Sequence, residues 1–222
     1  MRFNLVEVFL LNLTSRLEKP VEKFLHFFTP RRREKILRHK FLADRNRTLW
    51  TELLIRSVIA KKNSCPIEEI LIEREKSGKP YVVGSNLKIS LSHSANWAAC
   101  TVGEVQSGVD VEENFSDALN IAKNFFSARE YRELCELDGR ARAEKFLCLW
   151  TLKESFAKFS GRNLDDVLRL EKIVGKNFFV AGAVVGVCTV PDALPENFTV
   201  VPKIFFNPDC MQDNSLGGEK NR

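Results

Sequence analysis

The sequence predicts an α+β protein of two halves, each built from short strands and one long helix. Apolar runs of strand length, bounded by turn-forming residues, occur in both halves of the chain. A break bounded by glycines at residues 103–108 separates the two sets. We therefore place one half at residues 1–104 and the other at residues 105–208. The polar tail at residues 209–222 is expected to be disordered.

In the first half, Leu5 to Leu11 predicts a strand, and residues 31–62 predict a helical stretch. The apolar runs KISLS and WAACTV predict two further strands joined by a turn at residues 94–96. The second part of the helical stretch places apolar residues on one stripe: Leu49, Trp50, Leu53, Leu54 and Val58. A helix with one apolar face is expected to pack on a sheet.

The second half begins with a predicted strand, GVDVE, at residues 108–112. The segments ALNIAKNFF, SAREYRELCEL and AEKFLCLWTLKESFAKF predict helices. Residues 177–190 and 197–206 are rich in β-branched and aromatic residues, which favour strands. The similar content of the two halves is typical of a duplicated unit, although no strong sequence repeat accompanies it.

Positive charge is concentrated in one segment. The chain carries a net charge of +5, and residues 31–47 hold eight Lys or Arg against two acidic residues. Two interpretations of this segment are open. It is either a solvated helix surface or a site for a phosphate-rich ligand or an acidic partner.

The cysteines and the apolar runs indicate in which cellular compartment the protein is expected. Six cysteines include no C-x-x-C pair and no histidine at zinc-finger spacing, which argues against a zinc site and favours a reducing compartment. Glu7 interrupts the short apolar N-terminal run, and no small-residue cleavage site follows it. No run of 18 apolar residues occurs. We expect a cytoplasmic protein with no membrane span.

Two carboxylates fall on one face of the predicted strand at residues 108–112. Side chains alternate along a strand, so Asp110 and Glu112 share a face while Val109 and Val111 point to the core. Such a pair is suited to bind one magnesium ion, which prefers oxygen ligands. The alternative is a solvent-exposed face of an antiparallel sheet.

Other candidate residues have equally ordinary alternatives. Glu154 and Lys158 lie four residues apart on a predicted helix. Either Glu154 binds the metal and Lys158 contacts a phosphate, or the two side chains form an ordinary ion pair on the surface. Glu130 is the last residue of an S-x-x-E capping box. His93 lies between two serines at a strand end, either as a structural residue or as part of a phosphate-binding turn.

Taken in order, these motifs resemble the phosphopantetheinyl transferases of the Sfp type. The resemblance rests on RRREK (31–35), NRTLWTELLIRSVI (46–59), GKPYV (78–82), ISLSHS (89–94), GVDVE (108–112), FFSAREY (125–131) and WTLKESFAK (150–158). It implies a monomer of two similar α/β subdomains related by a pseudo-twofold axis, with the active site in the cleft between them. It also implies magnesium-dependent transfer of the 4′-phosphopantetheine arm of coenzyme A to a serine of an apo acyl or peptidyl carrier protein. The carrier could belong to fatty-acid, polyketide or nonribosomal peptide synthesis.

The resemblance also implies roles for individual residues. Asp110, Glu112 and Glu154 match the magnesium ligands, and Glu130 matches the carboxylate proposed as general base, acting with Glu154 and Lys158 in catalysis. The residues that match coenzyme A contacts are Arg32, Lys35, Arg47, Thr48, Lys79, Pro80, Ser92, His93 and Lys158. Arg32 stands where the family commonly has lysine.

Competing functions remain open from the sequence alone. The basic segment at residues 31–47 could serve a nucleic-acid-binding module, although that function leaves the carboxylates unexplained. The carboxylates could also belong to another magnesium-dependent phosphotransferase or a nuclease, but no glycine-rich triphosphate loop occurs. A homologue that binds carriers without modifying them is a further alternative.

Overall fold

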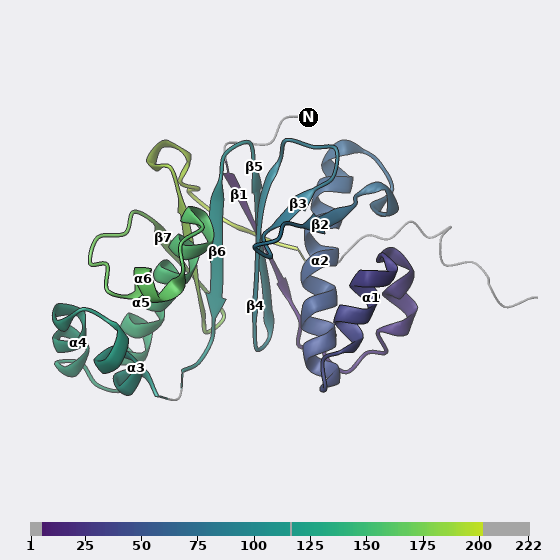
Figure 1. Cartoon of the computed structure of the whole chain (residues 1–222). Coiled ribbons are helices and arrows are strands. Elements are labelled where there is room, and N and C mark those ends of the chain that lie inside the picture. Colours follow the sequence, from purple (N-terminus) through teal and green to yellow (C-terminus); the bar gives the residue numbers. More distant parts are fainter. Residues whose placement is uncertain (1–5, 116, 202–222) are drawn as a thin grey trace, which may run out of the picture.

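The computed structural model describes residues 6–115 and 117–201. Its strands form two main sheets that lie in the middle of the molecule, with α2 on the outer side of one sheet and α5 on the outer side of the other (Figure 1). A two-stranded hairpin of β2 (Ile72–Arg74) and β3 (Pro80–Val82) lies on the side of α2. This architecture confirms the predicted α+β fold with two subdomains.

The first sheet has the order β4-β5-β1-β9. Strands β4 (Lys88–Ser94) and β5 (Trp97–Gly103) form the predicted hairpin, and β1 (Val6–Asn12) pairs antiparallel with β5. The short β9 (Thr199–Val200) comes from the other end of the chain and pairs parallel with β1. The C-terminal part of the described chain therefore completes the N-terminal sheet.

The helical stretch predicted at residues 31–62 is two helices rather than one. The helix α1 (Pro30–Leu37) ends before a short connection, and α2 (Leu42–Asn63) begins after it. Short 3-10 turns, Glu22–Phe27 and Ile67–Glu69, lie before α1 and after α2. The expected apolar stripe on α2 is also too narrow a description, because residues 49–60 are buried on every side, including Glu52 and Arg56.

The second sheet has the order β6-β8-β7, formed by β6 (Ser107–Glu112), β7 (Lys176–Val180) and β8 (Ala183–Thr189). The long helix α5 (Gly139–Ser160) packs across β6 and β8. Glycines permit this close approach: a Cβ atom on Gly108 would lie 1.9 Å from the Ser155 carbonyl oxygen, and one on Gly186 would lie 2.5 Å from that of Thr151. The backbone of α5 is thus held directly against the strand that carries Asp110 and Glu112.

Three shorter helices complete the second half: α3 (Ala118–Phe125), α4 (Ala128–Cys135) and α6 (Leu164–Leu168). An aromatic cluster under them includes Phe126, Phe146 and Trp150, with the rings of Phe126 and Phe146 stacked 5.4 Å apart. A 3-10 turn, Pro191–Ala193, precedes β9. Side chains of α3, α4 and α6 pack in this cluster against Phe146 and Trp150 of α5.

The two halves share a core. Val8, Leu10 and Trp97 of the first sheet pack with Val109 and Val185 of the second, and other side chains extend this cluster on both sides. Strand β6 also lies against β4 and β5. This apolar cluster holds β1 and β5 against β6 and β8, and β4, which pairs with β5, lies beside β6.

The remaining sequence-based expectations concern membrane spans, the cysteines and the C-terminal end of the chain. None of the described helices is long and apolar enough to cross a membrane. The five cysteines in the described parts are free thiols. The strand predicted at residues 197–206 is described only up to residue 201, and the tail at residues 209–222 lies outside the described residues.

Candidate active site

Asp110 and Lys158 form an ion pair where β6 meets the end of α5. Lys158 Nζ lies 2.7 Å from Asp110 Oδ1, and it also donates to the Val109 carbonyl oxygen and to Ser92 Oγ, each at 3.1 Å. The Ser92 hydroxyl donates to Asp110 Oδ1 at 2.7 Å. Asp110 is 3% exposed, which excludes the solvent-exposed sheet face considered from the sequence.

The second carboxylate oxygen of Asp110, Oδ2, differs from Oδ1 in its contacts. Asp110 Oδ2 is buried and has no hydrogen-bond partner among the residues that the structure describes. A buried carboxylate oxygen without a partner is costly, because it has lost its water and gained nothing in exchange. This oxygen is therefore available to a ligand that is absent from the protein alone.

The β4–β5 hairpin supports the second carboxylate of β6. The Ser94 hydroxyl donates to Glu112 Oε2 at 2.6 Å. Next to it, Asn96 donates to Glu113 through its backbone amide and, at 3.0 Å, through its side-chain nitrogen. The turn predicted at residues 94–96 thus joins the two halves of the protein at the end of β6.

Negative charge accumulates around this point. Burial raises the pKa of Glu112 to about 7, and the carboxylates of Asp110 and Glu154 add to the rise while the Ser94 hydrogen bond and Lys158 oppose it. Burial also raises the pKa of Glu154, again with a contribution from Asp110. The charges of Asp110 and Glu154 therefore disfavour the ionised form of Glu112, and a bound cation would relieve this repulsion.

The donor set fits magnesium, although the side chains do not form a closed metal site. Within the described residues, no three His, Cys, Asp or Glu side chains are arranged to hold a metal ion. One oxygen of Asp110, Oδ1, already contacts the ammonium group of Lys158. Carboxylate oxygens are nevertheless the ligands that magnesium prefers, and Asp110 Oδ2 is free to coordinate. The assignment of Asp110, Glu112 and Glu154 to magnesium stays a prediction.

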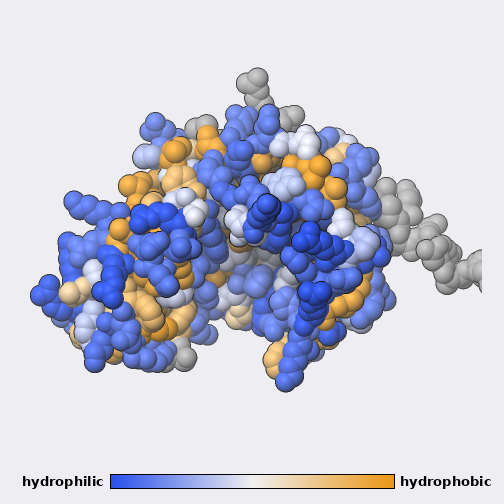
Figure 2. All heavy atoms as spheres, in the orientation of Figure 1, coloured by the Kyte–Doolittle hydropathy of each residue, from blue (hydrophilic) through white to orange (hydrophobic). Residues whose placement is uncertain are grey.

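A cavity of about 720 Å³ opens beside this cluster, which is within the size range of small-ligand sites. It is bounded by α2, β4, the loop between β2 and β3, and the region where α5 ends. Figure 2 shows mostly hydrophilic residues over the middle of this face, with hydrophobic patches mainly on the half that contains α5. The predicted residues that line the cavity are Arg32, Thr48, Lys79, Pro80, Ser92, His93 and Lys158.

Two predicted phosphate contacts lie outside the cavity lining. Lys35 borders a smaller neighbouring cavity of about 260 Å³, together with Arg31 and Lys76. Arg47 bonds to Asp44 Oδ1 at 2.6 Å and to the Ala95 carbonyl oxygen at 2.9 Å. Arg47 therefore ties α2 to the β4–β5 turn in this structure.

His93 lines the cavity and is exposed as a residue, although the protein around it removes part of the water from its ring. Its pKa is lowered by desolvation from the surrounding protein, and the positive charges of Lys158 and Arg47 lower it further. The free protein consequently favours the neutral imidazole at this position. An anion bound among these cations would reverse part of that effect.

Glu130 is part of a buried network on α4. Its backbone amide donates to Ser127 Oγ, and its carboxylate accepts from the Ser127 amide at 3.1 Å, which confirms the predicted capping box. Its other oxygen forms an ion pair with Lys153 Nζ at 2.9 Å. Glu130 is not among the residues that line the 720 Å³ cavity. Its role as a general base stays a prediction.

Sequence reasoning missed a buried ion network under the cavity. Glu52 is 1% exposed and accepts from Arg32 Nε at 2.7 Å and from Arg56 at 3.1 Å. Arg56 in turn donates to the Phe27 carbonyl oxygen and lies over the Phe28 ring. The sequence did contain a signal: a Glu and an Arg four residues apart lie within an apolar run. Such a run is buried, so the pair within it is expected to be buried as well.

Other cavity residues had no recognisable signal. Arg74, Arg162 and Asn163 line the cavity from loops and strand ends that are distant in sequence. Lys153 was also missed: its Nζ contacts Glu130, the Leu170 carbonyl oxygen at 2.7 Å and the Phe126 ring. These residues are brought to the site by tertiary packing rather than by a local pattern.

Comparison with known proteins gives consistent matches in both halves. A family model described as "4′-phosphopantetheinyl transferase, N-terminal" matches residues 17–105, and one described as "4′-phosphopantetheinyl transferase superfamily" matches residues 106–180. The two models together cover most of the chain and meet in the turn between β5 and β6.

Individual relatives carry the same name. The chain is 36% identical over 147 residues to 4′-phosphopantetheinyl transferase psf-1 of Bacillus pumilus, covering 66% of this chain and 63% of that protein. It is 35% identical over 144 residues to 4′-phosphopantetheinyl transferase Sfp of Bacillus subtilis, covering 64% of each. It is 32% identical over 143 residues to 4′-phosphopantetheinyl transferase HetI of Nostoc, covering 61% of this chain and 56% of that protein. The matched part thus spans less than two thirds of the length of these curated relatives.

Proposed function

Because the chain belongs to the 4′-phosphopantetheinyl transferase superfamily, we propose that it transfers the 4′-phosphopantetheine arm of coenzyme A to a serine of an apo acyl or peptidyl carrier protein. The observation that carries the proposal is the placement of three carboxylates and Lys158 beside a cavity lined by basic residues. That arrangement suits a ligand with several phosphate groups. It also supplies a place for a divalent cation next to them.

The proposed reaction is a single group transfer. The serine oxygen of the carrier forms a bond to the phosphorus adjacent to pantetheine, and the bond from that phosphorus to the oxygen bridging the two phosphates breaks. The products are the holo-carrier and adenosine 3′,5′-bisphosphate, and the serine proton leaves to a base. No oxidant or further co-substrate is needed.

The first role of the protein is to bind coenzyme A. We assign the basic and hydroxyl side chains of the cavity to its phosphates, with Arg32 and Thr48 on one side and Ser92, His93 and Lys158 on the other. Lys79 and Pro80 form the edge where the adenine would lie. Lys35 and Arg47 belong to the same proposal, but they would have to contact the ligand from outside the cavity lining.

We assign a magnesium ion to Asp110, Glu112 and Glu154, in keeping with the free Asp110 Oδ2 and the raised pKa values of the two glutamates. When bound, the ion withdraws negative charge from phosphate oxygens. Lys158 contributes in the same direction, since its ammonium group can donate to a phosphate oxygen as the negative charge on the leaving group grows. Ser92 and Ser94 hold the two strand carboxylates in place.

The proton of the carrier serine needs an acceptor, and Glu130 is the residue we assign. Both of its carboxylate oxygens are engaged, by Lys153 and by the Ser127 amide. A carboxylate oxygen can accept more than one hydrogen bond, so these contacts orient Glu130 without excluding a bridging water. Lys153 is correspondingly a positioning residue.

Carrier-dependent release of adenosine 3′,5′-bisphosphate tests the proposed reaction. Coenzyme A, magnesium and the enzyme are incubated with and without an apo carrier, and the nucleotide is measured by liquid chromatography. We expect release only with the carrier, in equal amount to holo-carrier formed. Release without a carrier would instead indicate a hydrolase. No release with any carrier, while a carrier still binds, would indicate a homologue without transferase activity.

A further inference from the structure

The proposed active site uses only part of the basic segment at residues 31–47. Arg32 lines the main cavity and Lys35 the neighbouring one, while Arg47 reaches the β4–β5 turn. Three other basic residues, Arg38, Lys40 and Arg45, lie where α1 turns into α2. We call this surface the corner patch, defined as Leu37, Arg38, Lys40, Phe41, Leu42 and Arg45.

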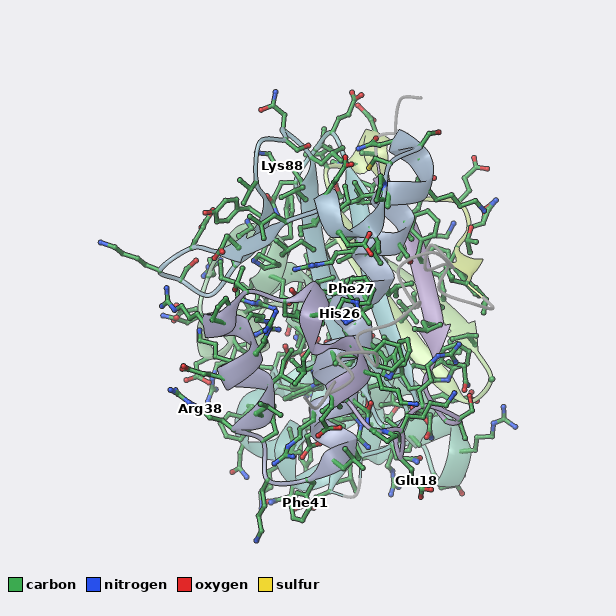
Figure 3. All side chains as sticks on the ribbon, turned by 90° about the vertical axis from the view of Figure 1, so that its right-hand side faces the viewer. Glu18, His26, Phe27, Arg38, Phe41 and Lys88 are labelled. Carbon is green, nitrogen blue, oxygen red and sulfur yellow. The ribbon has the colours of Figure 1, made fainter. Side chains whose placement is uncertain are left out.

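The corner patch exposes large apolar side chains. Phe41 is 62% exposed, Leu42 40% and Leu37 38%. Lys40 Nζ lies 5.3 Å from the centre of the Phe41 ring, which leaves the rest of the ring open. In Figure 3, Phe41 lies at the lower end of this half and Arg38 at its edge, and both point away from the ribbon. Grouped exposed apolar side chains of this kind mark an interaction surface.

Positive charge surrounds these apolar side chains and is poorly compensated. Asp44 is engaged by Arg47, and Arg38 pairs with Glu34 at 3.6 Å, with both side chains largely exposed. Arg45 donates to the His39 carbonyl oxygen, which carries no net charge. A matching partner would therefore be acidic and would present apolar side chains of its own.

A chain of contacts links the corner patch to the active site. His39, within the same connection, lies 3.2 Å from Thr48, which lines the cavity. Arg47 bonds to the Ala95 carbonyl oxygen in the β4–β5 turn, and Ser94 of that turn bonds to Glu112. The corner patch is thus connected through Thr48 to the cavity wall and through the β4–β5 turn to Glu112.

We propose that the corner patch is a docking surface for the apo carrier protein, with Phe41 and Leu42 as its apolar anchors. The proposal rests on the proposed transferase function, because it is that function which calls for an acidic protein substrate beside the carboxylates. The aliphatic side chains of Leu37 and Leu42 favour a protein partner over a nucleic acid, which would use the aromatic ring and the cations alone.

Variants at exposed positions can test this surface without disturbing the fold. Phe41 is the N-cap of α2, a position where serine is favourable, so Phe41→Ser is expected to fold normally. Leu42→Ser is the second variant. Phe179, which is 59% exposed on β7 in the other half, provides a matched control as Phe179→Ser.

Two readouts are measured for each variant: steady-state transfer to an apo acyl carrier protein and an apo peptidyl carrier domain, and binding of the same carriers by calorimetry without coenzyme A. We expect Phe41→Ser to raise KM for the carrier and to weaken carrier binding by about tenfold, as truncation of an aromatic anchor does. KM for coenzyme A and kcat at saturating carrier should not change. Phe179→Ser should behave as the wild type.

The outcomes separate the docking surface from the transferase activity. Normal transfer with an unchanged carrier KM in both patch variants would overturn the docking proposal and leave the proposed function standing. Carrier binding that depends on Phe41 without any transfer would support docking and contradict the proposed function. Loss of binding to a short single-stranded DNA in Phe41→Ser, with carrier binding intact, would assign the patch to nucleic acid and overturn the proposal.

Discussion

Lys158 Nζ lies 2.7 Å from Asp110 Oδ1, and this ion pair joins the last part of α5 to the middle of β6. The same carboxylate keeps its second oxygen buried and without a partner in the described residues. Lys158 therefore stabilises Asp110 on one side while the other side remains available for a cation. This relationship makes Asp110 the residue whose replacement separates the proposed metal binding from folding most clearly.

Replacing Asp110 by Asn should abolish transfer while leaving the protein folded. The amide keeps the shape that accepts from Ser92 and Lys158, but it removes the charge that a magnesium ion requires. We expect a loss of activity on the order of 10²- to 10³-fold, as for the removal of a group that stabilises transition-state charge. Transfer assays and circular dichroism at rising magnesium concentration check this. Wild-type turnover in the variant would refute the metal assignment.

Replacing Glu52 by Gln should destabilise the protein, because Arg56 would lose its buried counter-charge. We expect a decrease in the free energy of unfolding of about 3 kcal/mol, typical of a broken buried pair. Arg32 would also lose its orientation, so the affinity for adenosine 3′,5′-bisphosphate should fall. Chemical denaturation and calorimetry measure the two effects.

Glu34→Gln is the matched control for Glu52, since it removes an exposed pair of the same helical spacing with Arg38. It should change stability by less than about 0.5 kcal/mol. If the two substitutions lowered the free energy of unfolding equally, the buried network would stabilise the protein no more than an exposed ion pair does.

Replacing Glu130 by Gln tests whether this residue acts on the substrate or only on the fold. The substitution leaves Lys153 buried without its ion-pair partner, so a lower unfolding temperature is expected in either case. A general base additionally predicts a lower kcat with unchanged affinity for coenzyme A, and a change in the pH profile of kcat. Lys153→Met supplies the comparison, because it disturbs the same pair and keeps the carboxylate. If both variants lose stability while kcat at a temperature well below unfolding is normal, Glu130 has a structural role only.

Proton uptake should accompany nucleotide binding through His93. In the free protein the pKa of His93 is lowered by desolvation and by Lys158 and Arg47. A bound phosphate would raise it again, so binding near pH 6.5 should take up a proton, and affinity should increase as the pH falls towards the raised pKa. Calorimetry in two buffers of different ionisation enthalpy measures this uptake. His93→Gln should remove the uptake by the imidazole and leave that of the ligand's own phosphate; equal uptake in both proteins would exclude His93 as the phosphate contact.

The sequence predicted the strands and the carboxylate face well, because these depend on local patterns. Alternation in GVDVE placed Asp110 and Glu112 on one face, and the turn residues at 94–96 marked the hairpin. The resemblance brought Glu154 and Lys158 to the same site, which the packing of α5 on Gly108 achieves physically. Periodicity alone could not predict how closely that helix approaches the strand.

Features that depend on tertiary packing escaped prediction. An amphipathic pattern cannot show that α2 is surrounded on all sides, and so Glu52 and Arg56 were not recognised as a buried pair. The connection between α1 and α2 carries no glycine or proline, so the two helices were predicted as one stretch. The pairing of β9 with β1 joins residues 190 positions apart, a contact for which a single sequence gives no local signal.

Intact-mass spectrometry tests the central claim most directly. A panel of apo acyl carrier proteins and apo peptidyl carrier domains is incubated with the protein and coenzyme A, with magnesium or with a chelator. The proposed function predicts that at least one carrier gains the mass of a single phosphopantetheine arm on a serine, in magnesium only. No gain on any carrier, or an equal gain in the presence of the chelator, would contradict magnesium-dependent phosphopantetheine transfer.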